Sequence, residues 1–263
     1  MRRMLAACTV LASTPSLAQP ADVPLGSRIA RASDEKYEEI TEVRLIASKY
    51  GDCVVKKAPD AARSFVLFGP SSDPNEGDPR SLVRKISDGN CLIKASQTFG
   101  GVEMRFPGDT MRYALANALF RRELQTALPL ADLAQVPGLK QATFDEGSFQ
   151  PPGGKKLNLN ALRELATAKQ TERDRITLAH FGECVVRADP RTSHAMLRTS
   201  VTTPEEHIAF RTLTKALSAC IPQGRTVKLG KATIRGAVAL NYYRLAKAPR
   251  LLPVAPPAVG SKN

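Results

Sequence analysis

The sequence predicts a mainly α fold of the α+β class. It consists of two internally duplicated helical modules, each with a short β-hairpin and one intramodule disulfide. Three observations lead to this prediction. A long stretch occurs twice, its apolar residues recur at helical spacing, and each copy holds two cysteines. Two copies are too few for a solenoid, so we expect each copy to form a module with its own core.

The repeat is clearest where "RLIASKYGDCVVKKAPD" (44–60) returns as "RITLAHFGECVVRADPR" (175–191). Most replacements keep the chemical character of the side chain. Asp52 with Lys56 becomes Glu183 with Arg187, and both pairs have the acid-first i,i+4 spacing that supports a helix. The first helix of each copy therefore carries the same pattern.

A second matched pair of segments closes each copy. "FPGDTMRYALANALFRR" (106–122) aligns with "LGKATIRGAVALNYYRL" (229–245), which pairs Thr110 with Thr233, Arg112 with Arg235, and Arg121 with Arg244. We expect a last helix over 110–125 and 233–247, with the two threonines as N-caps.

The remaining helices follow from periodicity and proline positions. An apolar stripe of Val43, Ile46, Ala47, Tyr50 and Val54 predicts that the first helix is amphipathic. Thr203, Pro204 and the two glutamates after them form a strong helix start. The second and third helices of the two copies are expected over 60–68 and 191–199, and over 79–87 and 204–220.

A β-hairpin is expected after the third helix, within "LIKASQTFGGVEMRF" (92–106). Val102, Met104 and Phe106 alternate with charged residues, and Gly100-Gly101 suits a two-residue turn. The corresponding segment of the second copy is shorter, as a hairpin that loses its tip would be.

The expected modules span 32–128 and 159–248. Between them, 129–158 contains Pro-Pro-Gly-Gly and is predicted to be a linker, with a helix from Leu157 onward that continues into the second module. The Pro-rich tail, 249–263, is expected to be disordered.

Residues 1–18 have the pattern of a signal peptide, with basic Arg2 and Arg3, a short apolar run, and Ser16-Leu17-Ala18 as the cleavage site. This predicts export to the periplasm or secretion. The alternative is a lipoprotein anchored through Cys8, but little apolar sequence precedes that cysteine. No later run has the roughly 18 apolar residues of a membrane helix, so no transmembrane segment is expected.

The chain is strongly basic. Residues 1–18 contain two Arg and no acidic residue, so cleavage lowers the net charge from +13 to +11. Such a charge attracts anionic polymers or lipid head groups. It also keeps an exported protein in solution without any partner. The absence of Trp and the lack of aromatic residues among basic ones argue against specific nucleic-acid binding.

The four cysteines after the leader are expected to form disulfides. A module that folded before duplication had to pair within itself, which predicts Cys53–Cys91 and Cys184–Cys220. The alternative is a zinc site, but the sequence has no C-x-x-C motif, and an oxidising compartment disfavours free thiolates. No metal is expected.

Gly51 and Gly182 lie at matching positions inside helices, where Gly costs about 1 kcal/mol against Ala. Their retention in both copies predicts a close approach by another backbone, from the hairpin or the last helix.

Histidine offers little catalytic pattern. His180 lies one helical turn before Cys184, but the first copy has Lys49 there, so a function common to both copies cannot use it. His194 and His207 are interpreted as ordinary surface residues.

Arg112, Arg121, Arg235 and Arg244 are the retained cations of the last helices and the candidate anion-binding residues. The alternative is that they form a solvated helix face.

The sequence contains no G-x-S-x-G, Walker loop, H-E-x-x-H or G-x-G-x-x-G motif, and it indicates no catalytic residue and no cofactor. We therefore expect a non-enzymatic binding or structural protein of the bacterial envelope that meets an anionic component or a partner protein. The alternative is a hydrolase with its site between the two modules. The oligomeric state is left open.

Overall fold

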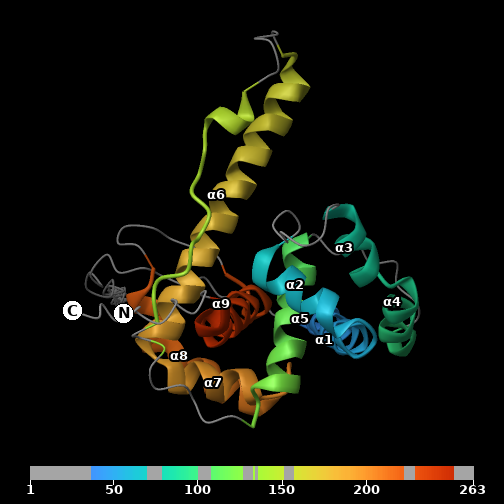
Figure 1. Ribbon diagram of the computed structural model, residues 1–263, viewed down its shortest axis with the longest axis vertical. Coiled ribbons are helices and arrows are strands. Elements are labelled where there is room, and N and C mark those ends of the chain that lie inside the picture. The colour runs from blue at the N-terminus through green and yellow to red at the C-terminus, as the bar shows by residue number, and fades with distance from the viewer. Residues whose placement is uncertain are drawn as a thin grey trace, which may run out of the picture.

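The computed structural model describes residues 37–69, 79–99, 108–126, 133, 136–150, 157–221 and 229–251. Within these ranges the regular structure is helical and contains no strand (Figure 1). The helices are α1 (Tyr37–Lys57), α2 (Pro59–Phe68), α3 (Pro79–Ile86), α4 (Gly89–Ser96), α5 (Gly108–Glu123), α6 (Leu159–Ala188), α7 (Pro190–Arg198), α8 (Pro204–Ala219) and α9 (Lys231–Leu251), with 3-10 turns η2 (Gln97–Phe99) and η4 (Gly147–Phe149).

The mainly helical prediction is confirmed, and the starts of α2, α7 and α8 have the expected local causes. Pro59, Pro190 and Pro204 occupy the first turns of α2, α7 and α8, where their missing N–H costs nothing. The Thr203 hydroxyl accepts a hydrogen bond from the Glu206 N–H and caps α8, as the sequence predicts.

The hairpin prediction is wrong for its first strand. Residues 92–96 belong to α4, and η2 follows directly. The Asp88 carboxylate caps α4 by accepting from the Cys91 N–H, so a local helix-start signal directly precedes these residues. Residues 100–107 and 222–228, which include the expected turns, lie outside the described residues.

The ends of α5 and α9 differ from the prediction. Thr110 and Thr233 are not N-caps, because α5 begins at Gly108 and α9 at Lys231, so each threonine is the third residue of its helix. Helix α9 continues to Leu251, beyond the expected end at residue 247 and into the segment expected to be a disordered tail. The leader, Cys8 and the tail from residue 252 lie outside the described residues.

Helices α5 and α9 pack against each other at the centre of the molecule (Figure 1). Helix α1 packs on α5, and α6 packs on α9. The buried apolar side chains of the first half (37–126) and the second half (157–251) belong to one continuous core. The two halves are therefore joined through α5 and α9, and the domain boundaries expected from the sequence stay a prediction.

Each half has a glycine where two helices touch. A Cβ on Gly51 would lie 2.5 Å from the Ala114 carbonyl oxygen, and a Cβ on Gly182 would lie 2.4 Å from that of Ala237. Only glycine allows helices to come this close. The close approach predicted at both glycines is present, and it is made by the last helix of each half.

Both predicted disulfides are present. Cys53–Cys91 has a Cα–Cα distance of 5.6 Å, and Cys184–Cys220 has one of 5.7 Å. Each closes a loop of just under forty residues, worth about 4 kcal/mol in the chain-entropy model. In the first half the bridge ties α1 to α4.

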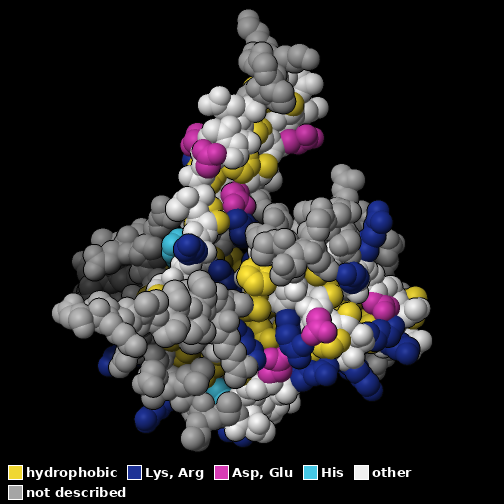
Figure 2. All heavy atoms as spheres, viewed as in Figure 1, with side chains coloured by type: hydrophobic (Ala, Val, Ile, Leu, Met, Phe, Trp, Pro, Cys, Tyr) yellow, Lys and Arg dark blue, Asp and Glu magenta, His cyan; other side chains and the backbone are white. Residues whose placement is uncertain are grey.

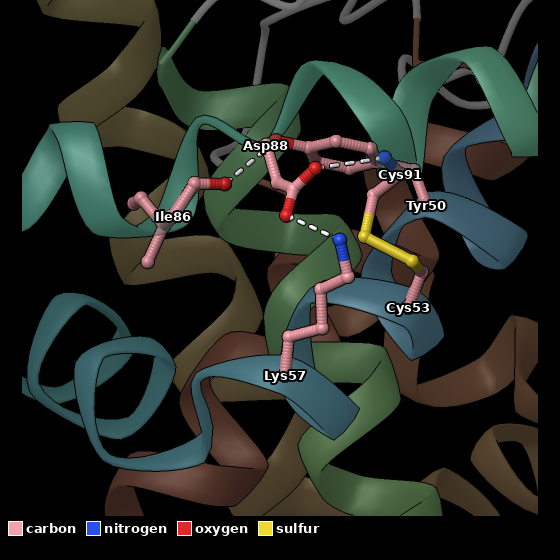
Figure 3. The surroundings of a disulfide bond; sticks show 6 residues. All are labelled: Tyr50, Cys53, Lys57, Ile86, Asp88 and Cys91. Carbon is pink, nitrogen blue, oxygen red and sulfur yellow. Dashed lines mark hydrogen bonds and ion pairs between the residues drawn. A yellow bond between two sulfur atoms is a disulfide. The ribbon is translucent and has the colours of Figure 1, made fainter.

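Hydrogen bonds surround the first bridge (Figure 3). The buried Tyr50 hydroxyl donates to the Ile86 carbonyl, and Lys57 donates to the Asp88 carboxylate that caps α4. The junction between α3 and α4 is thereby fixed to α1 by a disulfide, a hydrogen bond and an ion pair.

Helix α6 is long, and its N-terminal half projects from the rest of the molecule (Figure 1). Residues 136–150, part of the expected linker, run beside it. The Arg187 guanidinium donates to the Leu133 and Val136 carbonyls, and the Glu183 carboxylate accepts from the Leu139 N–H. Glu183 also pairs with Arg187, as predicted. Among the described residues, no helix has the length and hydropathy needed to cross a membrane.

Candidate functional site

The four arginines predicted as anion-binding residues fall into two clusters. The first arginine cluster contains Arg121 and Arg235 together with Arg44 of α1, and the second contains Arg112 and Arg244 together with Arg175 of α6. Each cluster combines arginines from both halves. Arg44 and Arg175 occupy matching positions of the repeat, and that match was the one sequence signal that could have added them to the prediction.

Arg235 and Arg112 serve the fold in the same way. Arg235 is 2% exposed and donates to the carbonyls of Leu197 and Thr199 at the end of α7. Arg112 donates twice to the Val66 carbonyl at the end of α2. Burial, which disfavours the charged form, lowers the pKa of both arginines to about 10. Both guanidinium groups thus satisfy carbonyls that a helix end leaves without partners.

A buried carboxylate completes the first arginine cluster. Glu206 of α8 is 1% exposed, and its Oε1 accepts hydrogen bonds from Arg44 and from Arg235, the latter at 3.0 Å. Its Oε2 accepts from the Thr202 N–H. Two buried guanidinium groups therefore share one carboxylate, so this group of three charges has a net charge of +1.

Arg121 and Arg244 lie further out. Arg121 donates to the Asp52 carboxylate at 2.6 Å and to the Ser48 hydroxyl. Arg244 instead donates to the Gln141 side chain, which in turn donates to Glu183, the residue that matches Asp52. Asp52 therefore binds an arginine of α5, whereas the sequence paired it with Lys56 along α1.

A small cavity adjoins the first arginine cluster. Its volume is about 120 Å³, and it lies between α1, α5 and the start of α9, where the two halves meet. Its polar lining includes Arg44, Ser48, Thr110, Asn117, Arg121, Thr233 and Arg235. The matching threonines of the repeat, predicted as caps, thus line the same cavity.

A second hollow, open to solvent and of about 240 Å³, lies between α1 and α5. Three cations and one carboxylate line it, namely Lys56, Arg121, Arg122 and Asp52. Further exposed cations occur on the same half, at Lys57, Arg84, Lys85 and Lys94. Figure 2 shows Lys and Arg side chains gathered on the side that carries α1, α3 and α4. We call this side, with its exposed cations Lys56, Lys57, Arg84, Lys85 and Lys94, the basic face.

The histidines are not equivalent. His194 is 3% exposed, so its interpretation as a surface residue is wrong. Its ring packs against Phe120 and Tyr242, and Nε2 lies 3.1 Å from the Leu124 carbonyl oxygen. His180 is exposed, and exposed His207 lies beside Lys231.

The contacts of His194 and His207 described above do not include a hydroxyl or carboxylate side chain. The alternative that the protein is a hydrolase stays a prediction. Among the described residues, no three side chains of His, Cys, Asp or Glu come together as metal ligands would. The four cysteines that the alternative zinc site would have used are bound in disulfides.

The chain matches no protein-family profile, no curated protein and no solved structure.

Proposed function

We propose that this is an exported, non-enzymatic binding protein of the bacterial envelope, and that its basic face meets an anionic surface such as acidic lipid head groups. The basic face itself carries the proposal. Its hollow is lined by three cations against one carboxylate, and that carboxylate, Asp52, is already paired with Arg121. An anionic surface would compensate the excess charge there.

Export is supported by the two disulfides, since such bridges persist in oxidising compartments such as the periplasm. The leader-like pattern of residues 1–18 supports it independently.

The proposal includes an origin by duplication of one stapled helical module. Matching residues make matching contacts, as in the glycine approaches, the two disulfides and the capping arginines Arg112 and Arg235. Duplication explains why these contacts recur. The basic face lies on the first half, so only one copy would carry the binding role.

Sedimentation with vesicles tests the function. The chain from residue 19 should sediment with phosphatidylglycerol vesicles at low salt and not with phosphatidylcholine vesicles. Binding should be lost at about 1 M salt, where the screening length falls to about 3 Å. Isolated envelope fractions should retain the protein with the same salt dependence.

Charge reversal locates the surface. Lys56, Arg84 and Lys94 are exposed side chains of α1, α3 and α4 on the basic face, and their combined replacement by Glu should abolish sedimentation. The matched control replaces three exposed cations of α7 and α8 by Glu, at Arg191, Arg211 and Lys215. If both variants lose vesicle binding equally, the net charge of the protein explains the binding. If the variant of the basic face still binds fully, the basic face is not the binding surface.

A further inference from the structure

We propose that the cavity beside the first arginine cluster is a binding site for one small oxyanion, of the phosphate or short-carboxylate class. Arg121 borders both this cavity and the hollow of the basic face, but the other residues that line the two differ, so the two sites can be tested separately. The cavity, its charge, its free donors and its size each support the proposal.

The charge balance of the surroundings favours an anion. Arg44 and Arg235 are almost fully buried and share the single carboxylate of Glu206. Arg121 is balanced by Asp52. One positive charge is therefore left without a counter-charge beside the cavity, and a buried unbalanced charge is costly unless something compensates it.

Arg44 has hydrogen-bond donors that no protein acceptor uses among the described residues. Its side chain is 4% exposed, and only Nη2 is used, on Glu206. Within the described part of the chain, its Nε and Nη1 have no protein acceptor, and the same is true of Nε and Nη1 of Arg121. Each of these N–H groups can donate one charge-assisted hydrogen bond to an oxygen of a carboxylate or phosphate.

The lining of the cavity also contains hydroxyl groups and helix ends. Thr110 and Thr233 line the cavity, and neither side chain has a partner among the described residues. Both lie in first turns, of α5 and α9, where the helix dipole favours negative charge. Asn117 holds Arg235 in place, since its side-chain oxygen accepts from the Arg235 Nε.

The size of the cavity limits the ligand. A volume of about 120 Å³ corresponds to roughly four water molecules at the ~30 Å³ that each occupies in the liquid. Inorganic phosphate or a short dicarboxylate suits this space, whereas a nucleotide or a sugar polymer does not.

Calorimetric titration of the chain from residue 19 with inorganic phosphate, and separately with succinate, tests the site. One of the two should bind with a stoichiometry of one, and the comparison identifies the source of the oxyanion. Arg121→Gln should weaken that binding about 10- to 100-fold, and the double variant Thr110→Val/Thr233→Val about 5-fold. Because valine keeps the shape of threonine, the double variant remains informative if Arg121→Gln does not fold.

Arg244→Gln is the matched control, because Arg244 occupies the same repeat position as Arg121 but belongs to the second arginine cluster. It should leave the affinity within about twofold. Replacement of Lys56, Arg84 and Lys94 should also leave it unchanged, which separates this site from the basic face. The proposal is overturned if neither anion binds the unaltered protein, or if Arg244→Gln weakens binding as much as Arg121→Gln.

Discussion

Arg44 of α1 and Glu206 of α8 form a buried ion pair that joins residues 162 positions apart. Glu206 also holds Arg235, so replacing its carboxylate leaves two guanidinium groups buried without a counter-charge. We expect Glu206→Gln to lower the free energy of unfolding by about 3–5 kcal/mol, measured by urea denaturation.

The neighbouring acid provides the control for this prediction. Glu205 is exposed in the same first turn of α8, and Glu205→Gln should leave the urea midpoint nearly unchanged. If the Glu206→Gln protein is as stable as the unaltered one, the Arg44–Glu206 pair does not contribute to the free energy of unfolding.

The two helix contacts at glycine make a second prediction. Gly51→Ala and Gly182→Ala place a methyl group against a backbone carbonyl, which cannot rotate away, so each should destabilise the protein by about 1–3 kcal/mol. Gly89→Ala is the control, since nothing lies within 4 Å of the added carbon. Thermal denaturation should rank the first two variants well below Gly89→Ala; equal midpoints would contradict the close approach.

Loss of the first bridge tests how strongly the halves are coupled. Cys53→Ala/Cys91→Ala should cost about 2–5 kcal/mol. The sequence, read as two independent modules, places that cost on the first half alone. Because the core runs through both halves, we expect a single unfolding transition instead. Hydrogen exchange of α7 and α8 checks this, and unchanged protection there would favour independent modules.

The sequence predicted the features that depend on local pattern. Proline positions marked the starts of α2, α7 and α8, and the repeat identified both disulfide pairs without any structure. The hairpin prediction gave weight to the alternation after residue 100 and overlooked Asp88, whose side chain starts α4. A capping carboxylate favours the start of a helix, and a single residue provides it.

The candidate site was less accessible from the sequence, because it depends on contacts between the halves. Glu206 is recognisable as an acid in a first turn, but nothing local shows that it is buried beside Arg44. The four retained arginines stay candidate anion-binding residues, and their division into two clusters follows from the packing of α5 on α9. Spacing along one helix does not contain that information.

His194 gives a prediction about pH. Burial is the main cause that holds its pKa below the ordinary value, and the charge of Arg198 acts in the same direction. An unfolded histidine takes up a proton near pH 6.5, whereas the folded protein resists doing so. Stability should therefore fall as the pH drops below about 6.5, and His194→Gln should remove part of that loss.

Urea denaturation at pH 7.5 and 5.5 measures the effect. The carboxylates with lowered pKa values, such as Glu123 and Glu183, lose their stabilising contribution only at lower pH. Burial raises the pKa of Asp109, but this carboxylate is present in every variant compared, so the difference between the variants reports the histidine. His180→Gln, at an exposed position, is the control and should keep the full dependence on pH. The same slope in all three proteins would contradict the role of His194.

The expected linker provides the last test of how the halves are held together. The Pro-Pro-Gly-Gly segment within 151–156 is where we predict the first cleavage in limited proteolysis. Neither disulfide crosses this segment, because Cys53–Cys91 precedes it and Cys184–Cys220 follows it. The two fragments would then be connected only by noncovalent contacts.

Those contacts are extensive, since α5 packs on α9, and Arg187 holds the Leu133 and Val136 carbonyls of the first fragment. We therefore expect the cleaved chain to elute as one species in size-exclusion chromatography under native conditions. The same sample should give two bands on a denaturing gel without reductant. Fragments that separate under native conditions would show that the modules are independent. A core common to both halves would hold the two fragments together.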